Sequence, residues 1–453
     1  MAEVMPFAGT RYVAKESQLS MADTIAPPFD MITPELQREL HARSELNIVR
    51  LVLGNSAPSD DENNNRHTRA AECYRDWKAR GVLSDEQRKC FYVYEQEYVP
   101  HSGSAPVKML GFFALVKLQD FRSAKIRSYE ETFDSPRADR LKLLRTTQVN
   151  ESPVNLLYHD SDNEVQDVLQ AAMKRLESIE EFKTPDGVVH RLWMMHKKDP
   201  ILAIHEAMKK RILYIADGHY QYETALKFRD EMREMTGRRD GRQPSDFALM
   251  FLQRAESEAT YARAVHRVLA RELSLDSDVE EVIEDLEDYF TVSEFKVNMK
   301  DLAKGEAQVA EKLKPARGVA TRMVMAMPSG RAWQLTLRKD IDLNDMIEEE
   351  TMSPDFKKLD VVLLHSYVIT RGWLGNPDME IGEDDILYRE EIGECLDLLQ
   401  RRKGCVAFFL NPLAKEDLLK VAENGELLPP RSLEFYPKIP SGLVLRDLQV
   451  GFG

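Results

Sequence analysis

The sequence predicts an α+β fold of two domains. Apolar runs of strand length, such as 212–216, occur between amphipathic helical segments without a sustained βαβ rhythm. The chain has 453 residues, which favours two domains over one. Hydrophobic residues make up 43% of it, a share that supports a substantial core and excludes a disordered composition.

The N-terminal part begins with an arm or strand over residues 1–26 and an extended Pro27-Pro28 segment. A helix over 33–43 follows, with Thr33 as its cap and Pro34 in the first helical position. The next predicted elements are strands over 47–53, 91–99 and 109–118 (the last two forming a hairpin), helices over 70–80, 137–147, 165–179 and 200–209, strands over 153–158 and 188–195, and a turn at 184–187.

The C-terminal part changes composition, because residues 272–314 are acidic and rich in helical patterns. We therefore predict a boundary near 270–275, with domains 1–270 and 271–453. The elements expected on either side are strands over 247–253 and 406–410, a hairpin of 322–328 with 332–337, and helices over 359–370 and 390–402. The tail, 429–442, is aromatic, proline-rich and basic, and whether it returns to the site stays open.

Charge and cysteine content exclude several classes of protein. Lys and Arg number 62, Asp and Glu 77, so the net charge is −15. Such a chain lacks the basic surface of general nucleic-acid binders, although a local pocket for a phosphorylated small molecule is allowed. Four scattered cysteines without Cys-x-x-Cys predict a reducing cytoplasm. We expect no signal peptide and no membrane association, and the oligomeric state is open.

One short stretch concentrates the candidate chemistry. The apolar run 212–216 is followed by Asp217-Gly218-His219, and a helix begins at Tyr220. A strand, a glycine turn and a helix direct backbone N–H groups and the helix dipole to one point, which favours an anion. Gly218 permits close approach or positive φ. The alternative is an ordinary helix start with a capping Asp217 and a partly exposed His219.

Further short motifs occur in a fixed order along the chain. They are Ala26-Pro27-Pro28-Phe29-Asp30, Asp139-Arg140-Leu141, Ser152-Pro153, Asp186-Gly187, His190-Arg191-Leu192-Trp193, Ile215-Ala216-Asp217-Gly218-His219, Tyr222-Glu223-Thr224-Ala225-Leu226, His266-Arg267, His365, Asn411-Pro412, Phe435-Tyr436-Pro437-Lys438 and Ser441-Gly442-Leu443. In this order they resemble the domain-of-unknown-function-1015 (DUF1015) family over nearly the whole chain. That family is similar to ParB/sulfiredoxin-fold enzymes, including ADP-dependent free serine kinase.

The resemblance implies a ParB/sulfiredoxin-like mixed α/β core, elaborated by a second C-terminal α+β region. It also implies a small-molecule kinase that transfers phosphate from ADP or ATP to a hydroxyl of an amino acid or similar metabolite. The implied phosphate-binding residues are Asp217, Gly218, His219, Tyr220, Gln221, His266, Arg267 and Lys438. The implied catalytic residues are Glu130, Asp30 and His219, with Glu130 preferred as the base and Asp217 as the Mg²⁺ ligand.

The chain departs from the family pattern at its presumed site. Tyr220 and Gln221 stand where the kinases have His and Arg, Tyr129 stands where His is usual, and Arg431-Ser432-Leu433 replaces Lys-Ser-Thr. Gln lacks the charge and planar fork of Arg. Losing one charged hydrogen bond of about 1.5–3 kcal/mol weakens binding roughly 10- to 150-fold. These departures predict an altered substrate or lost catalysis.

Two alternatives to a kinase follow from these departures. One is a non-catalytic nucleotide or metabolite binder that kept the fold, and the other is a partner protein that uses the acidic segment 275–315. At the level of residues, Asp30 only caps the helix near Thr33, and Glu223, the third candidate for the proton acceptor, only pairs with Lys227. His266-Arg267 is a buried structural pair, and His365 is a satisfied core histidine. The basic segment 237–242 is interpreted as a mobile surface loop rather than a phosphate clamp.

Overall fold

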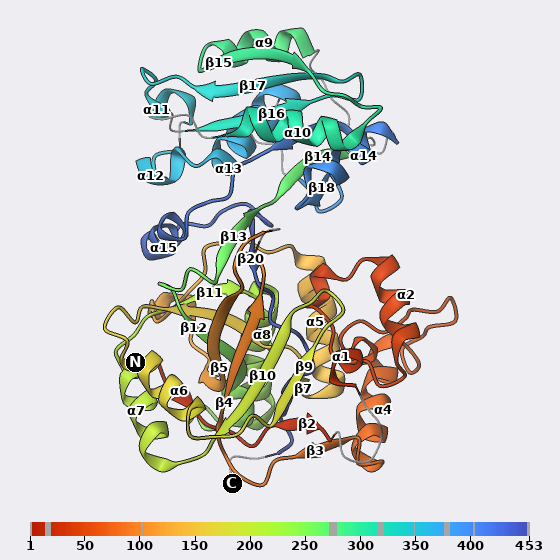
Figure 1. Cartoon of the computed structure of the whole chain (residues 1–453), viewed down its shortest axis with the longest axis vertical. Coiled ribbons are helices and arrows are strands. Elements are labelled where there is room, and N and C mark those ends of the chain that lie inside the picture. Colours follow the sequence, from red (N-terminus) through yellow and green to blue (C-terminus); the bar gives the residue numbers. More distant parts are fainter. Residues whose placement is uncertain are drawn as a thin grey trace. The chain divides into compact units, whose positions relative to one another are not determined.

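The chain folds into two compact units (Figure 1). The computed structural model describes residues 2–13, 20–100, 103–270, 279–314, 321–347, 349–375, 381–401 and 404–450. Unit 1 comprises Met1–Ser128, Asp134–Tyr261 and Pro437–Gly453, and unit 2 comprises Tyr129–Phe133 and Ala262–Tyr436. The division at Tyr261 precedes the predicted boundary at 270, and most of the interval 270–275 lies outside the described residues. Residues 437–453 belong to unit 1, where strand β21 (Arg446–Asp447) pairs with β7 (Val149–Asn150), whereas residues 429–436 of the tail belong to unit 2.

Unit 1 contains a nine-stranded mixed sheet. Its strands are β1 (Val4–Met5), β4 (Phe91–Tyr98), β5 (Val107–Lys117), β6 (Ile126–Arg127), β8 (Val154–Tyr158), β9 (Glu180–Lys183), β10 (Val189–Met195), β11 (Leu213–Asp217) and β12 (Phe247–Arg254). The order is β6-β11-β8-β12-β5-β4-β10-β9, with β1 on β5. β12 is parallel to β8 and β6 to β11, whereas β4 and β5 form the predicted antiparallel hairpin.

Both faces of this sheet are buried, because alternate residues of its central strands enter different clusters. In β4, Phe91 and Val93 belong to one cluster and Tyr92 and Tyr94 to another. The same alternation continues in β5. Side chains of a strand point to opposite faces with a period of two, so apolar residues at every position indicate a sheet covered on both sides.

The six predicted helices of unit 1 are confirmed, with ends that differ by a few residues, and the structure adds two short helices, α1 (Met21–Thr24) and α3 (Val49–Val52), that were not predicted. The remaining helical elements are the 3₁₀ turn η2 (Phe29–Met31), α2 (Pro34–Arg43), α4 (Arg66–Ala79), the 3₁₀ turn η3 (Phe121–Ser123), α5 (Asp134–Thr147), α6 (Glu164–Met173), α7 (Lys198–Lys209), α8 (His219–Thr236) and the 3₁₀ turn η4 (Pro244–Asp246). A small ladder joins β2 (Thr10–Tyr12) to β3 (Leu83–Asp85). The segment 1–26, predicted as an arm or strand, contains the short strands β1 and β2 and the helix α1.

The predicted strand over 47–53 is wrong, since α3 occupies its centre. Buried Asn47 explains the difference. Its side-chain oxygen accepts from the Val49 N–H at 2.9 Å, and its amide donates to the carbonyls of Asp23 and Ile25 at 2.7 and 2.9 Å. A polar side chain that satisfies the start of a turn favours a helix, and apolar alternation over so few residues does not oppose it.

Helices α5 and α8 lie parallel and in register. Arg137 of α5 pairs with Glu223 of α8 at 2.8 Å, and Arg145 pairs with Glu231 at 2.5 Å, so both pairs span the same sequence interval. Glu223, which was predicted to pair with Lys227 on its own helix, thus forms an ion pair with the neighbouring helix. Since the helices run in one direction, their N-termini lie at the same end, where their dipoles add.

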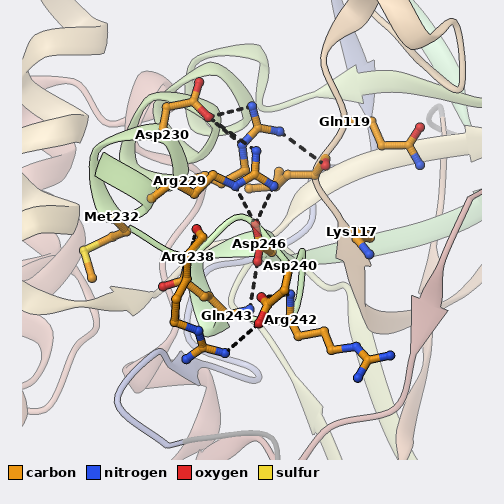
Figure 2. Close-up of polar contacts among 12 residues, drawn as sticks. Lys117, Gln119, Arg229, Asp230, Met232, Arg238, Asp240, Arg242, Gln243 and Asp246 are labelled. Atoms are coloured by element: carbon orange, nitrogen blue, oxygen red, sulfur yellow. Dashed lines mark hydrogen bonds and ion pairs between the residues drawn. The ribbon is translucent and has the colours of Figure 1, made fainter. Parts of the chain in front are cut away.

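The loop after α8 is held by its own polar contacts (Figure 2). Fully buried Asp246 accepts from Arg233 at 2.6 Å and from the Gln243 N–H at 2.8 Å. Arg238 pairs with Asp240 at 3.0 Å. Because α8 has 18 residues, this loop is roughly 27 Å from the helix start. It is therefore a surface loop at the opposite end of α8 from Gly218.

Unit 2 contains a six-stranded antiparallel sheet ordered β15-β17-β16-β19-β14-β18. Its strands are β14 (His266–Ala270), β15 (Phe290–Lys296), β16 (Arg322–Ala326), β17 (Arg331–Leu337), β18 (Ile386–Arg389) and β19 (Gly404–Phe409), and a separate pair joins β13 (Tyr261–Ala264) to β20 (Leu433–Tyr436). Its helices are α9 (Val279–Glu287), α10 (Leu302–Leu313), α11 (Leu343–Met346), α12 (Pro354–Lys357), α13 (Asp360–Leu363), the π-helix η5 (Leu364–Trp373), α14 (Ile392–Gln400) and α15 (Lys415–Asn424).

The acidic segment predicted as helix-rich also contains an edge strand. β15 separates α9 from α10 and pairs with β17 along seven residues. Several positions of β15 are polar and exposed, so it lacks a strong strand pattern. The sequence therefore predicted only the helices on either side of it. The hairpin β16–β17 is confirmed. Within the described ranges, no helix combines the length and apolarity needed to cross a bilayer.

Candidate functional site

The predicted turn after β11 forms as a strand, a left-handed glycine and a helix. Gly218 has φ 89° and ψ 31° and precedes α8 directly. A Cβ atom on it would lie 3.2 Å from the Val154 Cα of the neighbouring strand β8. Glycine is therefore required both by the backbone conformation and by the close approach of β8. The result is a helix N-terminus placed at the end of a buried strand, an arrangement that favours an anion.

Asp217 is held at this turn by two contacts. One carboxylate oxygen accepts from the Gly218 N–H at 2.9 Å, and the other accepts from Lys438 Nζ at 2.9 Å. The side chains of Asp217 and Lys438 are only 18% and 14% exposed. The backbone carbonyl of Lys438 in turn accepts from buried Gln96 at 2.9 Å. Lys438 of the tail thus places a cation at the start of α8. The sequence had left open whether the tail returns to this site.

A β-bulge sets the direction of Asp217. β11 pairs with β8 through Ile215 and Leu156, then skips Ala216 so that Asp217 lies opposite Asn155. Bulges change the direction of a side chain and are common beside active sites. Below the bulge, a buried chain of hydrogen bonds runs from Thr260 through Gln253 to Asn155, with distances of 2.6 and 2.9 Å.

His219 is buried and uncharged. Burial is the main cause that lowers its pKa to about 4; the Lys438 charge lowers it further and the Asp217 charge opposes the shift. At neutral pH the imidazole is therefore neutral. It can form hydrogen bonds at the turn, but it adds no positive charge for a phosphate.

Tyr220 and Gln221 complete the first turn of α8. The Tyr220 ring packs edge-on against Phe29, with 6.3 Å between centroids, and the Arg140 guanidinium lies 4.3 Å from the centre of the Phe29 ring. The side-chain oxygen of Gln221 is buried and has no hydrogen-bond partner in the described part of the chain. It lies 3.4 Å from the Cβ position at Gly218, so the amide faces the turn.

The N-terminal segment and the tail pair beside the same turn. The Ser441 N–H donates to the Ala26 carbonyl at 2.8 Å, and the Ala26 N–H donates back at 3.3 Å. Ser441 and Ser152 share a hydrogen bond of 2.5 Å between their hydroxyls. Unit 1 therefore gathers four motifs that are distant in sequence, namely 26–30, 139–153, 217–221 and 438–442.

Asp30 lies in this group on η2, next to Phe29. The alternative that it only caps the following helix is wrong. Thr33 is the cap, because its hydroxyl accepts from the Leu36 N–H at 3.2 Å, and Pro34 follows in the first helical position. Asp30 thus keeps its predicted role as a candidate proton acceptor.

Three predicted site residues belong to unit 2. Glu130 accepts from the Ser432 N–H at 3.0 Å. His266 accepts from the Leu410 N–H at 3.3 Å, and burial lowers its pKa to about 3. Fully buried Arg267 donates to the Arg431 carbonyl at 3.1 Å and to His365 at 3.3 Å. The predicted roles of Glu130 as the catalytic base and of His266 and Arg267 at a phosphate stay predictions.

Asp217 is the predicted ligand of Mg²⁺. Among the described residues, no three His, Cys, Asp or Glu side chains gather as a metal site. Mg²⁺ often uses only one or two carboxylates together with substrate phosphates. Asp217 fits that limited role, since each of its oxygens keeps a further lone pair beside its existing hydrogen bond.

The neutral form of His219 leads to a pH prediction. Its folded pKa of about 4 is below its unfolded value of 6.5, so the unfolded state takes up the proton first as the pH falls. The stability contribution is complete above pH 6.5 and is lost as the pH falls towards 4, by up to about 3 kcal/mol. Urea unfolding at pH 7 and pH 4.5 should show a smaller loss for His219→Gln than for the wild type.

His190→Gln is the matched control. His190 is also buried in unit 1, and burial lowers its pKa to about 4 as well. Both variants should reduce the pH dependence by a similar amount. An equal loss of stability in the wild type and in His219→Gln would contradict the neutral, buried state of His219.

Comparison with known proteins gives one family match. Residues 4–362 match the family described as "Protein of unknown function (DUF1015)". No curated protein matches the chain. Similar solved structures include a conserved hypothetical protein from Pyrococcus furiosus (12% identity, TM-score 0.35, covering 74% of this chain and 96% of that one). A free serine kinase in complex with AMP is 12% identical, with a TM-score of 0.34, and the match covers 73% of this chain and 92% of that one. SbnI with C-terminal truncation from Staphylococcus aureus is 10% identical, with a TM-score of 0.33, and the match covers 74% of this chain and 87% of that one. At such low TM-scores these neighbours do not establish a shared fold.

Proposed function

The chain belongs to the DUF1015 family, and we propose that unit 1 binds nucleotide phosphates as part of a small-molecule kinase similar to free serine kinase. The observation that carries the proposal is the ion pair of Lys438 and Asp217 at the start of α8. It places a fixed ammonium group beside a helix N-terminus, and both attract phosphate oxygens. The motif resemblance supplies the kinase class and the ParB/sulfiredoxin-like fold.

Phosphoryl transfer depends mainly on positioning and on neutralisation of charge. In the proposal, Lys438 and the N-terminus of α8 hold the phosphates, and Gly218 lets the backbone approach them. Asp217 orients Lys438, and it is the carboxylate available to Mg²⁺, which when bound neutralises phosphate charge. Asp30 is the proposed proton acceptor in unit 1, for a hydroxyl of an amino acid or similar metabolite.

A non-catalytic nucleotide binder is the second candidate, and specific observations favour it. His219 is neutral, Tyr220 packs against Phe29, and Gln221 carries no charge. In the first turn of α8, therefore, no side chain adds positive charge at neutral pH. Lys438 then supplies the side-chain cation in unit 1 that both candidates require.

Thermal shift of the full chain tests the proposal. ADP, ATP, CTP and GTP are added with Mg²⁺, with and without L-serine. A ligand that binds only the native state raises the melting temperature. A shift with one nucleotide that serine enlarges supports the kinase, and a nucleotide shift indifferent to serine supports the binder. No shift with any nucleotide, in folded protein, would contradict both.

The paired variant Tyr220→His with Gln221→Arg is expected to bind nucleotide at least tenfold more tightly than the wild type. Arg adds one charged, bidentate hydrogen bond of about 1.5–3 kcal/mol. The measurement is an isothermal calorimetric titration with the nucleotide that gives the thermal shift. Gln221→Met is the control, because it fills the same space without a charge and should not tighten binding. Unchanged affinity in the paired variant would show that these positions do not face the phosphates.

A further inference from the structure

A cavity of unit 1 lies along the seam between α5 and α8. Its volume is about 260 Å³, and it is lined by Arg137, Ala138, Leu141, Glu223, Thr224 and Lys227. None of these residues belongs to the turn at residues 217–221, although Glu223 is also a predicted candidate for the proton acceptor. The cavity lies near the N-terminal ends of both helices, which run parallel, so both dipoles favour negative charge there.

Thr224 gives the cavity an unused hydrogen-bonding group. Its side chain is only 4% exposed, and its hydroxyl has no hydrogen-bond partner among the described residues. The other threonines of α5 and α8 behave differently. Thr146, Thr147 and Thr236 each donate to the carbonyl four residues earlier, at 2.7, 2.9 and 2.7 Å. Buried hydroxyls are normally paired, so the Thr224 hydroxyl lacks a partner that a ligand in the cavity would supply.

Charged groups of both signs surround this hydroxyl. Arg137 donates to Glu223 at 2.8 Å and also pairs with exposed Asp134. Lys227 is exposed and forms no ion pair with any residue in the described ranges. A ligand can therefore place an acidic group against Lys227 and Arg137, and a hydrogen-bond donor against Glu223.

The volume limits the size of the ligand. A water molecule takes up about 30 Å³ of liquid, so the cavity has room for roughly eight water-sized groups. That is the size of an organic acid with three or four carbons, and it is smaller than a nucleotide. The nucleotide of the proposed function therefore does not compete for this space.

We propose that the α5–α8 cavity binds a small organic acid that also carries a hydrogen-bond donor. The carboxylate contacts Lys227 and Arg137, the donor contacts Glu223, and Thr224 pairs with either group. This site does not rest on phosphate transfer, because binding requires only the residues named here.

Isothermal calorimetry of the full chain without nucleotide tests the proposal. The probes are glycerate, glycine and acetate; the first two carry a donor and acetate does not. We expect saturable binding of glycerate or glycine with one site per chain, and at least tenfold weaker binding of acetate. Glycerate and glycine distinguish a hydroxyl from an ammonium donor, and binding of either one supports the site.

Variants locate the bound acid. Lys227→Gln, Arg137→Gln and Thr224→Val should each weaken binding at least tenfold. The matched controls, Arg145→Gln and Thr147→Val, remove an equivalent seam ion pair and an equivalent buried hydroxyl outside the cavity, and should change affinity less than twofold. Absence of saturable binding for every probe would overturn the proposal, as would binding that the three cavity variants leave unchanged. If the chain binds one of these acids but no nucleotide, the proposed function is contradicted and the acid site is not.

Discussion

Replacing Lys438 with Met is expected to remove the nucleotide-induced rise in melting temperature. Lys438 is the cation that contacts Asp217, and both side chains are mostly buried. Its loss removes a charge-assisted contact to phosphate, of about 1.5–3 kcal/mol, and so weakens binding roughly 10- to 150-fold. It also leaves a carboxylate at the same point, which repels phosphate. The measurement is nucleotide titration by thermal shift and calorimetry.

Lys117→Met is the matched control for this variant. Lys117 lies in unit 1 and pairs with Glu3 at 3.1 Å, but its place is on β5, away from the turn. Both variants lose one lysine–carboxylate pair, and only Lys438→Met should lose the response to nucleotide. An undiminished nucleotide-induced rise in melting temperature in Lys438→Met would contradict the proposed site. A double variant with Asp217→Asn should recover part of the affinity, because the repelling charge is then gone as well.

Gly218→Ala is expected to destabilise unit 1 strongly. The left-handed conformation costs a residue with a side chain about 1–2 kcal/mol. The new methyl group lies 3.2 Å from the Val154 Cα, a backbone atom of a buried strand that cannot move without disturbing the sheet. Together these effects predict a cost of about 2–4 kcal/mol and a displaced helix start. Urea unfolding and nucleotide titration measure the two consequences.

Gly237→Ala separates the two causes. Gly237 closes the other end of α8 with φ 67°, and a Cβ atom there has no neighbour within 4 Å. It should cost only the conformational part, about 1–2 kcal/mol, and should leave nucleotide binding unchanged. If both glycine variants lose equal stability and bind nucleotide equally well, the close approach of β8 to Gly218 has no role in the site.

Most elements of unit 1 were predictable because their signals are local. The strands β4, β5, β10 and β12 have the predicted places, as do the helices α5, α7 and α8. Apolar periodicity and turn chemistry act within one element, so a single sequence contains them. The wrong strand at α3 shows the limit, because it depends on hydrogen bonds from Asn47 to Asp23 and Ile25, more than twenty residues away.

The candidate site was only partly predictable for a related reason. The turn at Gly218 is local, and the sequence identified it together with Asp217 and His219. The pairing of Lys438 with Asp217 joins residues 221 positions apart. Buried Asn155 and Gln253 interrupt apolar strands, which is a visible signal, but their partners are not visible in the sequence.

The sequence by itself determined the mixed α/β elements, the glycine turn and the motifs that identify the family. Periodicity and the steric demands of glycine and proline express themselves between neighbouring residues. Only the tertiary structure decided that residues 437–453 return to unit 1, that His219 is neutral, and that α5 and α8 run parallel around a cavity. Burial, ion pairing and the closeness of distant segments depend on the whole packed chain, because desolvation and electrostatic interactions act through space rather than along the sequence.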